Sequence, residues 1–302
     1  MNDPSTRCEL HGHRGARGLW PENTLAGFRA ALALGVDALE MDVGLSADGV
    51  VVVSHDPRLN PDLTRDANGA FLDGPGPLLR ALPFATLRSY DIGRARPGSP
   101  VAAANPAQRA AEGERIPALA EVLALDASVF LSIEIKTFPD QAALTASPEE
   151  IVAGVVAAAT AAGALGRIGI ISFDARALRH AALLAPSVRR SFLSELETTA
   201  AAALWWGEDC AALAPDAAAA AARCGAQAWG PDARELDAAA IARAHALGLL
   251  VLPWTVNDPA AMARLIGWGV DGLTTDRPDL AREVMAARGM ALPPARGGSR
   301  GG

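Results

Sequence analysis

Short apolar runs alternate with longer alanine- and leucine-rich stretches along almost the whole chain, and this alternation is the strongest constraint on its fold. Eight of the runs have the length and composition of strands: residues 8–12, 37–43, 129–136, 167–172, 188–193, 226–229, 249–255 and 270–274. Helical stretches follow most of them: residues 23–34, 148–162, 174–184, 235–246, 258–267 and 277–287. Such alternation predicts βαβ units and a parallel sheet. Eight strands in 302 residues favour a closed (β/α)₈ TIM barrel, although a doubly wound open sheet fits the same pattern.

Two regions depart from the alternation. "DGVVVVSHD" predicts an extra strand outside the eight, and the following segment, residues 57–116, is rich in Pro, Gly, Asn and Arg with little helical periodicity. A loop of that length predicts a small insertion after the second strand. The end of the chain, "LPPARGGSRGG", predicts a disordered tail. We therefore expect one barrel domain over residues 1–290 that carries the insertion, and a tail over residues 291–302.

Composition limits the partners and the compartment. A net charge of −7 and a pI near 5.3 argue against nucleic acid but leave room for a local cationic pocket. Cys8, Cys210 and Cys224 form no CxxC pair and are odd in number, which predicts no disulfide framework and fits a reducing compartment. The N-terminus carries no signal-peptide pattern, and "IVAGVVAAATAAGALG" is shorter than the roughly 20 residues of a membrane span. We expect a soluble, cytoplasmic monomer or homodimer without stable membrane anchoring.

Charged residues lie inside two of the predicted strands, near their carboxyl ends. Glu40 and Asp42 are two residues apart in "ALEMDV", as are Glu134 and Lys136 in "SIEIK", so each pair faces one side of its strand. An ion pair explains either pair taken alone, because unpaired charges inside apolar strands are costly. Barrel active sites, however, form at the carboxyl ends of the strands. Three carboxylates from two strands therefore predict a site for one divalent cation, Mg²⁺ or Ca²⁺.

The proposed metal site gives a structural context to two histidines in "HGHRG" and a third in "VVVSHD". His13 follows the first strand and His55 ends the extra strand, so both lie near the carboxylates. With Arg14 and Lys136 they supply the parts that phosphoryl transfer needs, namely cationic charge and an acid–base pair. His11 is expected to face away from His13, into the core or the barrel bottom.

An ordered series of motifs then resembles the glycerophosphodiester phosphodiesterase family. The motifs are "HRGARGLWPENTLAGF", "ALEMDVGLSADGVVVVSHD", "RIPALAEVL", "SIEIK", "ISFD", "WTVND" and "GVDGLTTDRP". The resemblance implies a (β/α)₈ barrel with a small insertion, and hydrolysis of glycerophosphodiesters to glycerol 3-phosphate and an alcohol with a divalent cation. It implies catalytic histidines at His13 and His55, metal ligands at Glu40, Asp42 and Glu134, and phosphate contacts from Arg14 and Lys136.

Five further residues have open roles. Trp254 is expected either to pack in the core or to form a wall against glycerol. Glu22 and Asn23 in "PENT" either cap the next helix or bind ligand, and Asp276 is expected to cap the last helix. Asp56 is expected to orient His55 or the insertion.

The sequence therefore favours a metal-dependent phosphodiesterase acting on a small glycerophosphodiester. One alternative is a phospholipase D-like enzyme acting on lysophospholipids or sphingomyelin. The other is a non-catalytic binding protein on the same barrel, which would have no need of two histidines for acid–base chemistry.

Overall fold

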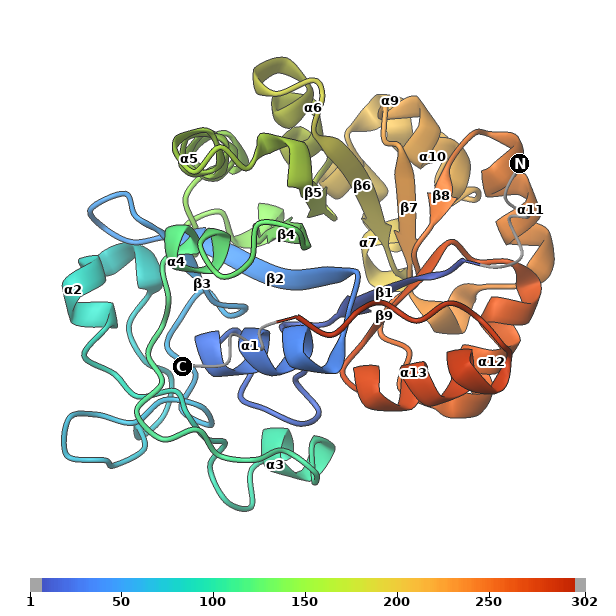
Figure 1. Ribbon diagram of the computed structural model, residues 1–302. Helices are drawn as coiled ribbons and strands as arrows, with labels where there is room; N and C mark the ends of the chain where they lie inside the picture. Colours follow the sequence, from blue (N-terminus) through green and yellow to red (C-terminus); the bar gives the residue numbers. More distant parts are fainter. Residues whose placement is uncertain (1–6, 297–302) are drawn as a thin grey trace.

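A nine-stranded sheet forms the centre of the computed structural model, which describes residues 7–296 (Figure 1). Eight strands run parallel: β1 (Glu9–Gly12), β2 (Ala38–Leu45), β4 (Phe130–Ile135), β5 (Ile168–Ser172), β6 (Arg189–Ser194), β7 (Ala228–Pro231), β8 (Leu250–Val251) and β9 (Gly272–Thr275). The short strand β3 (Val51–Val53) pairs antiparallel with β2. All eight predicted strands and the extra one are confirmed.

The eight parallel strands close into a barrel. Their order is β8-β7-β6-β5-β4-β2-β1-β9, so the first and last strands of the chain are neighbours, visible as blue beside red in Figure 1. Across the remaining seam, Asp271 N donates to Val251 O and Thr274 N to Pro253 O, both at 3.0 Å. The fold is a (β/α)₈ TIM barrel, which rules out the doubly wound open sheet.

Helices between the strands surround the barrel (Figure 1). The larger ones are α1 (Leu25–Leu34), α5 (Pro148–Ala161), α6 (Ala175–Leu184), α11 (Ala238–Ala246), α12 (Pro259–Trp268) and α13 (Pro278–Ala287), with the short α4 (Leu119–Leu123) before β4. Alternate strand residues such as Leu39, Met41 and Val43 join the main core with Phe28 and Ala31 of α1. Their neighbours along each strand are thereby free to face the barrel interior. No helix among residues 7–296 has the length and apolarity to span a membrane.

Four short helices between β6 and β7 were not predicted, and they change the interpretation of the cysteines. They are α7 (Leu196–Ala200), α8 (Ala202–Trp206), α9 (Glu208–Ala211) and α10 (Ala217–Arg223). A disulfide joins Cys210 in α9 to Cys224 at the end of α10, while Cys8 is buried and free. The expectation of no disulfide is therefore wrong. The pairing depends on how α9 packs on α10, which the spacing of the cysteines does not reveal.

The segment that follows β3 builds a small core of its own beside the barrel. It contains a 3₁₀ turn (Leu79–Ala81), α2 (Phe84–Leu87) and α3 (Pro100–Ala104). Leu59, Leu79, Leu87 and Ile116 pack together on Val52 of β3. The insertion is therefore tied to β3 by apolar contacts.

The expected disordered tail is corrected for residues 291–296. Arg282 Nη1 donates to Pro293 O at 2.6 Å, and Arg296 N donates to Leu32 O at 2.7 Å, so this segment lies against α13 and α1. One acceptor is the Leu32 carbonyl near the end of α1 and the other is the Pro293 carbonyl of the tail itself, and a Gly- and Pro-rich composition predicts neither contact. Residues 297–302 lie outside the described residues.

The disulfide gives a direct test. Unfolded without reductant, the protein should expose one reactive thiol, from Cys8; after reduction it should expose three. Closing a loop between positions 14 residues apart should stabilise the fold by about 3 kcal/mol, so Cys224→Ala should lower the free energy of unfolding by about 2–4 kcal/mol. Three reactive thiols in the non-reduced protein would contradict the pairing.

Candidate active site

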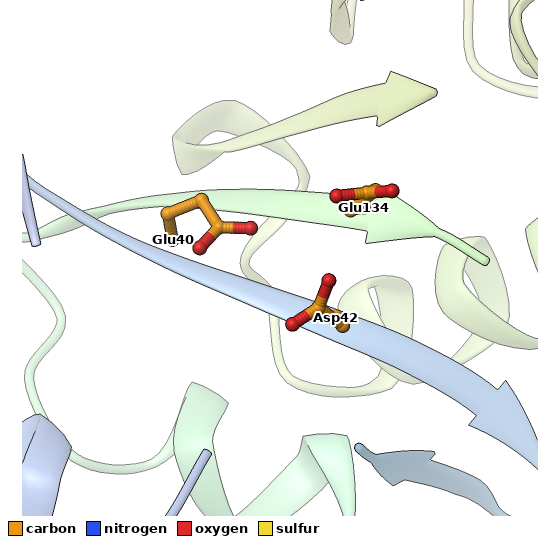
Figure 2. A group of neighbouring side chains, drawn as sticks. All are labelled: Glu40, Asp42 and Glu134. Atoms are coloured by element: carbon orange, nitrogen blue, oxygen red, sulfur yellow. The ribbon is translucent and has the colours of Figure 1, made fainter. Parts of the chain in front are cut away.

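Three buried carboxylates from the neighbouring strands β2 and β4 lie close together (Figure 2). The parallel register places Asp42 beside Glu134, and Glu40 lies one inward position below Asp42. Oxygen atoms of the three lie within 4.8 Å of one another. All three side chains are buried, and Asp42 Oδ1 has no hydrogen-bond partner among the described residues. A buried, hard oxygen cluster with an unsatisfied atom fits a divalent cation.

Cationic side chains surround this triad. Arg14 Nε lies 3.2 Å from Asp42 Oδ2, and Lys136 Nζ lies 2.7 Å from Glu134 Oε1 and 3.8 Å from Asp42 Oδ1. Both cations line the same cavity as Glu40 and Glu134. Because they stand beside the carboxylates and face open space, their remaining donors are available to an anion bound there.

Burial and neighbouring charges shift the pKa values of Glu40 and Asp42 in opposite directions. Burial raises the pKa of Glu40 well above its usual range, and the negative charges of Asp42 and Glu134 raise it further. Burial also opposes ionisation of Asp42, but Arg14, His55 and Lys136 together hold the pKa of Asp42 well below its usual range. Such opposed shifts in adjacent groups are typical of functional sites.

A tight turn after β1 places His13 and Arg14 over the triad. A Cβ on Gly12 would lie 2.1 Å from Gly15 O, so the turn closes only around glycine. Arg14 has φ of 49°, a left-handed conformation that non-glycine residues rarely adopt. Its backbone N–H donates to Glu40 Oε2 at 2.8 Å. This contact offsets the strain and ties the turn to the triad.

His13 is oriented by the far end of the chain. Its Nδ1 lies 2.6 Å from Asp276 Oδ1, and Asn257 Nδ2 donates to Asp276 Oδ2 at 2.7 Å. Burial opposes ionisation of Asp276, but His13 and Arg17 lower its pKa to about 2. The expected helix-capping role is therefore wrong, since Arg277 is the N-cap of α13 and Asp276 bonds to His13 instead. The other ring nitrogen, Nε2, lies 3.9 Å from Glu40 Oε2.

His55 reaches the cavity because β3 runs back along β2. Ser54 N donates to Asp42 O at 2.9 Å, so the next residue, His55, returns to the triad. His55 Nδ1 lies 2.8 Å from Asp56 Oδ1, and Asn60 Nδ2 donates to Asp56 Oδ2 at 2.6 Å. Asp56 thus contacts both His55 and the insertion, the two roles expected of it.

Glu22 and Asn23 brace the site and do not cap α1. The N-cap is Thr24, whose hydroxyl accepts from Gly27 N. Glu22 Oε1 accepts from Arg14 Nη1 at 2.8 Å, and Asn23 Nδ2 donates to Asp42 Oδ2 at 2.9 Å. The motif "PENT" therefore holds the side chains of Arg14 and Asp42 in place.

Many of these groups line one cavity of about 320 Å³ inside the mouth of the barrel. His13, Arg14, His55 and Lys136 line one side together with Glu40 and Glu134. The lining also contains an apolar group made of Ile171, Phe173, Leu193, Leu252 and Trp254, with Glu195 nearby in the chain. Trp254 stacks edge-on with Phe173 at 5.5 Å between ring centroids, so it both packs and lines the cavity.

His11 also lines this cavity, which corrects part of the expectation for it. Residues two apart on a strand face the same side, so His11 and His13 both point into the barrel. His11 lies one level deeper and is almost fully buried, and its Nε2 is 2.9 Å from Glu9 Oε2. The expected location near the barrel bottom agrees with this depth.

Sequence comparison identifies a family that the chain matches. The profile of the glycerophosphoryl diester phosphodiesterase family matches residues 13–280. A glycerophosphodiester phosphodiesterase of Bacillus subtilis (strain 168) is 29% identical over 277 residues, which is 90% of this chain and 84% of the relative.

Structural comparison agrees. A crystal structure of a provisionally named glycerophosphoryl diester phosphodiesterase from Silicibacter pomeroyi DSS-3 has a TM-score of 0.86 and 35% identity, with 95% of each chain covered. An Oleispira antarctica phosphodiesterase, solved with its product sn-glycerol-3-phosphate, has a TM-score of 0.69 and 24% identity, with 92% of this chain and 96% of that chain covered. The latter supports the fold alone.

The contact between His13 and Asp276 predicts a pH-dependent contribution to stability. Because the folded-state pKa of Asp276 is about 2, below its unfolded value, the contribution is complete above about pH 5 and is lost as the pH falls towards 2. Asp276→Asn should lower the free energy of unfolding by about 2 kcal/mol at pH 5. Urea unfolding at pH 5 and pH 3 should show this difference shrinking; a difference that grows on acidification would contradict the contact.

Proposed function

Because the chain belongs to the glycerophosphoryl diester phosphodiesterase family, we propose that it hydrolyses small glycerophosphodiesters to glycerol 3-phosphate and an alcohol, with two histidines transferring the protons. The chain is an enzyme of the phosphodiesterase class, so the alternative of a non-catalytic binding protein is set aside. The observation that carries the finer proposal is the cavity in which a carboxylate triad stands beside two histidine–aspartate pairs.

Glu40, Asp42 and Glu134 are the proposed ligands of one divalent cation, Mg²⁺ or Ca²⁺. The cluster fits such an ion because its oxygen atoms converge and Asp42 Oδ1 lacks a hydrogen-bond partner among the described residues. When bound, the ion supplies positive charge that polarises the phosphoryl oxygens. The proton favoured on Glu40 would leave as the ion binds.

Arg14 and Lys136 are the proposed phosphate-binding cations. Burial would lower the pKa of Lys136, but Glu134 and Asp42 keep it above the ordinary lysine value, so the side chain is charged at neutral pH. Arg14 is held by Glu22 and Asp42. Two fixed cations at a buried site take up the charge that builds on the phosphoryl oxygens in the transition state.

His13 and His55 are the proposed acid–base pair. Each ring bonds through Nδ1 to an aspartate, Asp276 or Asp56, and each lines the cavity. An aspartate at Nδ1 fixes the orientation of the imidazole and leaves Nε2 for proton transfer. One histidine takes the proton of the attacking hydroxyl, and the other delivers a proton to the departing alcohol oxygen.

The phospholipase D-like alternative concerns the substrate and not the chemistry. The apolar wall around Phe173 and Trp254 is the feature that favours it, while Trp254 is our proposed contact for the carbon skeleton of glycerol. Assays of glycerophosphocholine, glycerophosphoethanolamine and a lysophospholipid side by side distinguish the two. The cytoplasmic location and the monomer-or-homodimer state stay predictions.

The first functional prediction concerns the metal. EDTA should abolish hydrolysis, and added Mg²⁺ or Ca²⁺ should restore it. Glu134→Gln keeps the shape but removes one ligand charge, so it should weaken metal binding at least about tenfold in calorimetry and lower activity with it. Glu121→Gln, in α4 and paired with Arg88, is the matched control and should change neither. Full activity in excess chelator, with no metal by elemental analysis, would refute the metal site.

The second functional prediction concerns the histidines. His13→Ala and His55→Ala should each lower kcat by roughly 10²–10⁴-fold, the usual contribution of one general acid or base. Metal content should stay nearly unchanged, because the carboxylates hold the ion. His245→Ala is the matched control, since His245 also pairs with an aspartate, Asp271, but lies on the outer surface.

A nitrophenyl phosphodiester separates the two roles. Its leaving group departs without protonation, so this substrate should rescue the variant that lacks the acid and leave the variant that lacks the base impaired. If either histidine can be removed with less than a fivefold effect on glycerophosphocholine, the acid–base assignment fails.

A further inference from the structure

Three neighbouring strands of the barrel are followed directly by a cation, an aromatic ring and an anion. Lys136 comes after the last residue of β4, Phe173 after that of β5 and Glu195 after that of β6. These strands lie side by side in the sheet, and all three side chains line the cavity. The proposed chemistry uses Lys136 but has no task for Glu195. This carboxylate is therefore a feature of the cavity that the phosphoryl reaction itself does not explain.

Glu195 differs from the other carboxylates in the lining of the cavity. Glu134 lies 2.7 Å from Lys136 Nζ, and Glu40 lies 3.9 Å from His13 Nε2. Within residues 7–296, Glu195 has no such cationic partner, and no hydrogen bond is made to its carboxylate oxygens. Its negative charge is consequently not neutralised by a neighbouring side chain of the described chain.

The helix that begins at this point leaves the carboxylate available. Glu195 is the N-cap of α7, but its side chain makes no capping hydrogen bond. Its backbone N–H donates to Thr198 Oγ1 at 3.2 Å, and the Thr198 hydroxyl donates to Glu195 O at 3.1 Å. The structural role of Glu195 is therefore carried by its backbone, and the side chain can change without loss of the cap.

The charge around Glu195 is predominantly negative. Burial raises the pKa of Glu195 above its usual range, and the charges of Glu197 and Asp232 raise it further, while Lys136 opposes the rise. A cation placed beside Glu195 would relieve this repulsion, whereas a second anion would increase it. The local field thus favours a positively charged group in this part of the cavity.

We propose that Glu195 is a specificity-determining residue that selects substrates whose alcohol carries an ammonium group, such as choline or ethanolamine. This inference rests on the proposed function, in which Arg14 and Lys136 bind the phosphate. The ammonium group then lies beside Glu195 and the Phe173 ring, because carboxylates and aromatic faces both attract such a cation. A neutral alcohol gains neither attraction, and an anionic alcohol is repelled.

The order of the three groups matches an alcohol of this kind. Adjacent strands lie roughly 5 Å apart, so the lining changes from cationic at Lys136 to anionic at Glu195 across two strand spacings. Ser172 pairs with Phe192 in the β5–β6 register, so Glu195 stands further toward the mouth than Phe173. A phosphate ester whose ammonium group lies a short chain away from the phosphorus therefore meets an opposite charge at each end.

The test uses two ligands that share a phosphate and a shape but differ in charge. They are phosphocholine and its uncharged isostere 3,3-dimethylbutyl phosphate, in which carbon replaces the quaternary nitrogen. Calorimetry on the full chain with Mg²⁺ should show tighter binding of phosphocholine. Glu195→Gln keeps the size but removes the charge, so it should weaken phosphocholine binding by about 3–10-fold, the usual size of a partly exposed ionic contact with a cation–π contribution. Binding of the isostere should change less than about twofold.

Glu197→Gln is the matched control. Glu197 lies in the same helix and carries the same charge, but it is exposed and does not line the cavity. Its loss should change the ratio of the two affinities by less than about twofold. Glu195→Asp, which retains the charge, should retain a preference for phosphocholine. Thermal unfolding of each variant separates loss of fold from loss of recognition.

Equal affinity of the wild-type protein for the two ligands would overturn the proposal, as would equal weakening of both ligands by Glu195→Gln. The proposed function fails separately, through absence of glycerophosphodiester hydrolysis, because the binding measurement needs no turnover. In turnover, Glu195→Gln should lower kcat/KM for glycerophosphocholine by the same factor of about 3–10, while kcat/KM for glycerophosphoglycerol, whose alcohol is neutral, should stay within about twofold.

Discussion

The parallel pairing of β2 with β4 is the constraint on which the site depends. It sets Asp42 beside Glu134 and leaves Glu40 one level below, so three carboxylates share one buried space. Burying like charges together opposes folding unless cations compensate for them. The positions of Arg14 and Lys136, and the turn that carries Arg14, follow from this requirement. The same charges suit the divalent ion and the anionic ester proposed for this site.

A second set of polar residues orients the side chains of the candidate site. Asp276 and Asn257 hold His13, Asp56 and Asn60 hold His55, and Glu22 with Asn23 holds Arg14 and Asp42. Each of these bonds is short, and three of the six are buried, so little freedom remains in the side chains that they hold. The apolar helices outside the barrel only have to keep the strands in register.

Sequence alone predicted the strands, the triad and the positions of His13 and His55 because each depends on local pattern. Alternation in "ALEMDV" and "SIEIK" is enough to place Glu40, Asp42 and Glu134 on inward faces. The partner of His13 was missed because Asp276 is 263 residues away and sits where a helix cap is expected. The disulfide between Cys210 and Cys224 was missed because it joins two short helices that the alanine-rich sequence did not predict. His11 was expected to face away from His13. This was wrong because residues two apart along a strand face the same side.

The adjacency of the first and last strands has a consequence for biosynthesis. β1 emerges from the ribosome long before its neighbour β9 and the aspartate that orients His13, which arrive only after residue 271. A nascent chain that already carries the whole carboxylate triad therefore still lacks the alignment of this histidine. The ordered orientation of His13 therefore requires synthesis beyond β9, and a fragment cut short before β9 lacks Asp276 and with it this orientation.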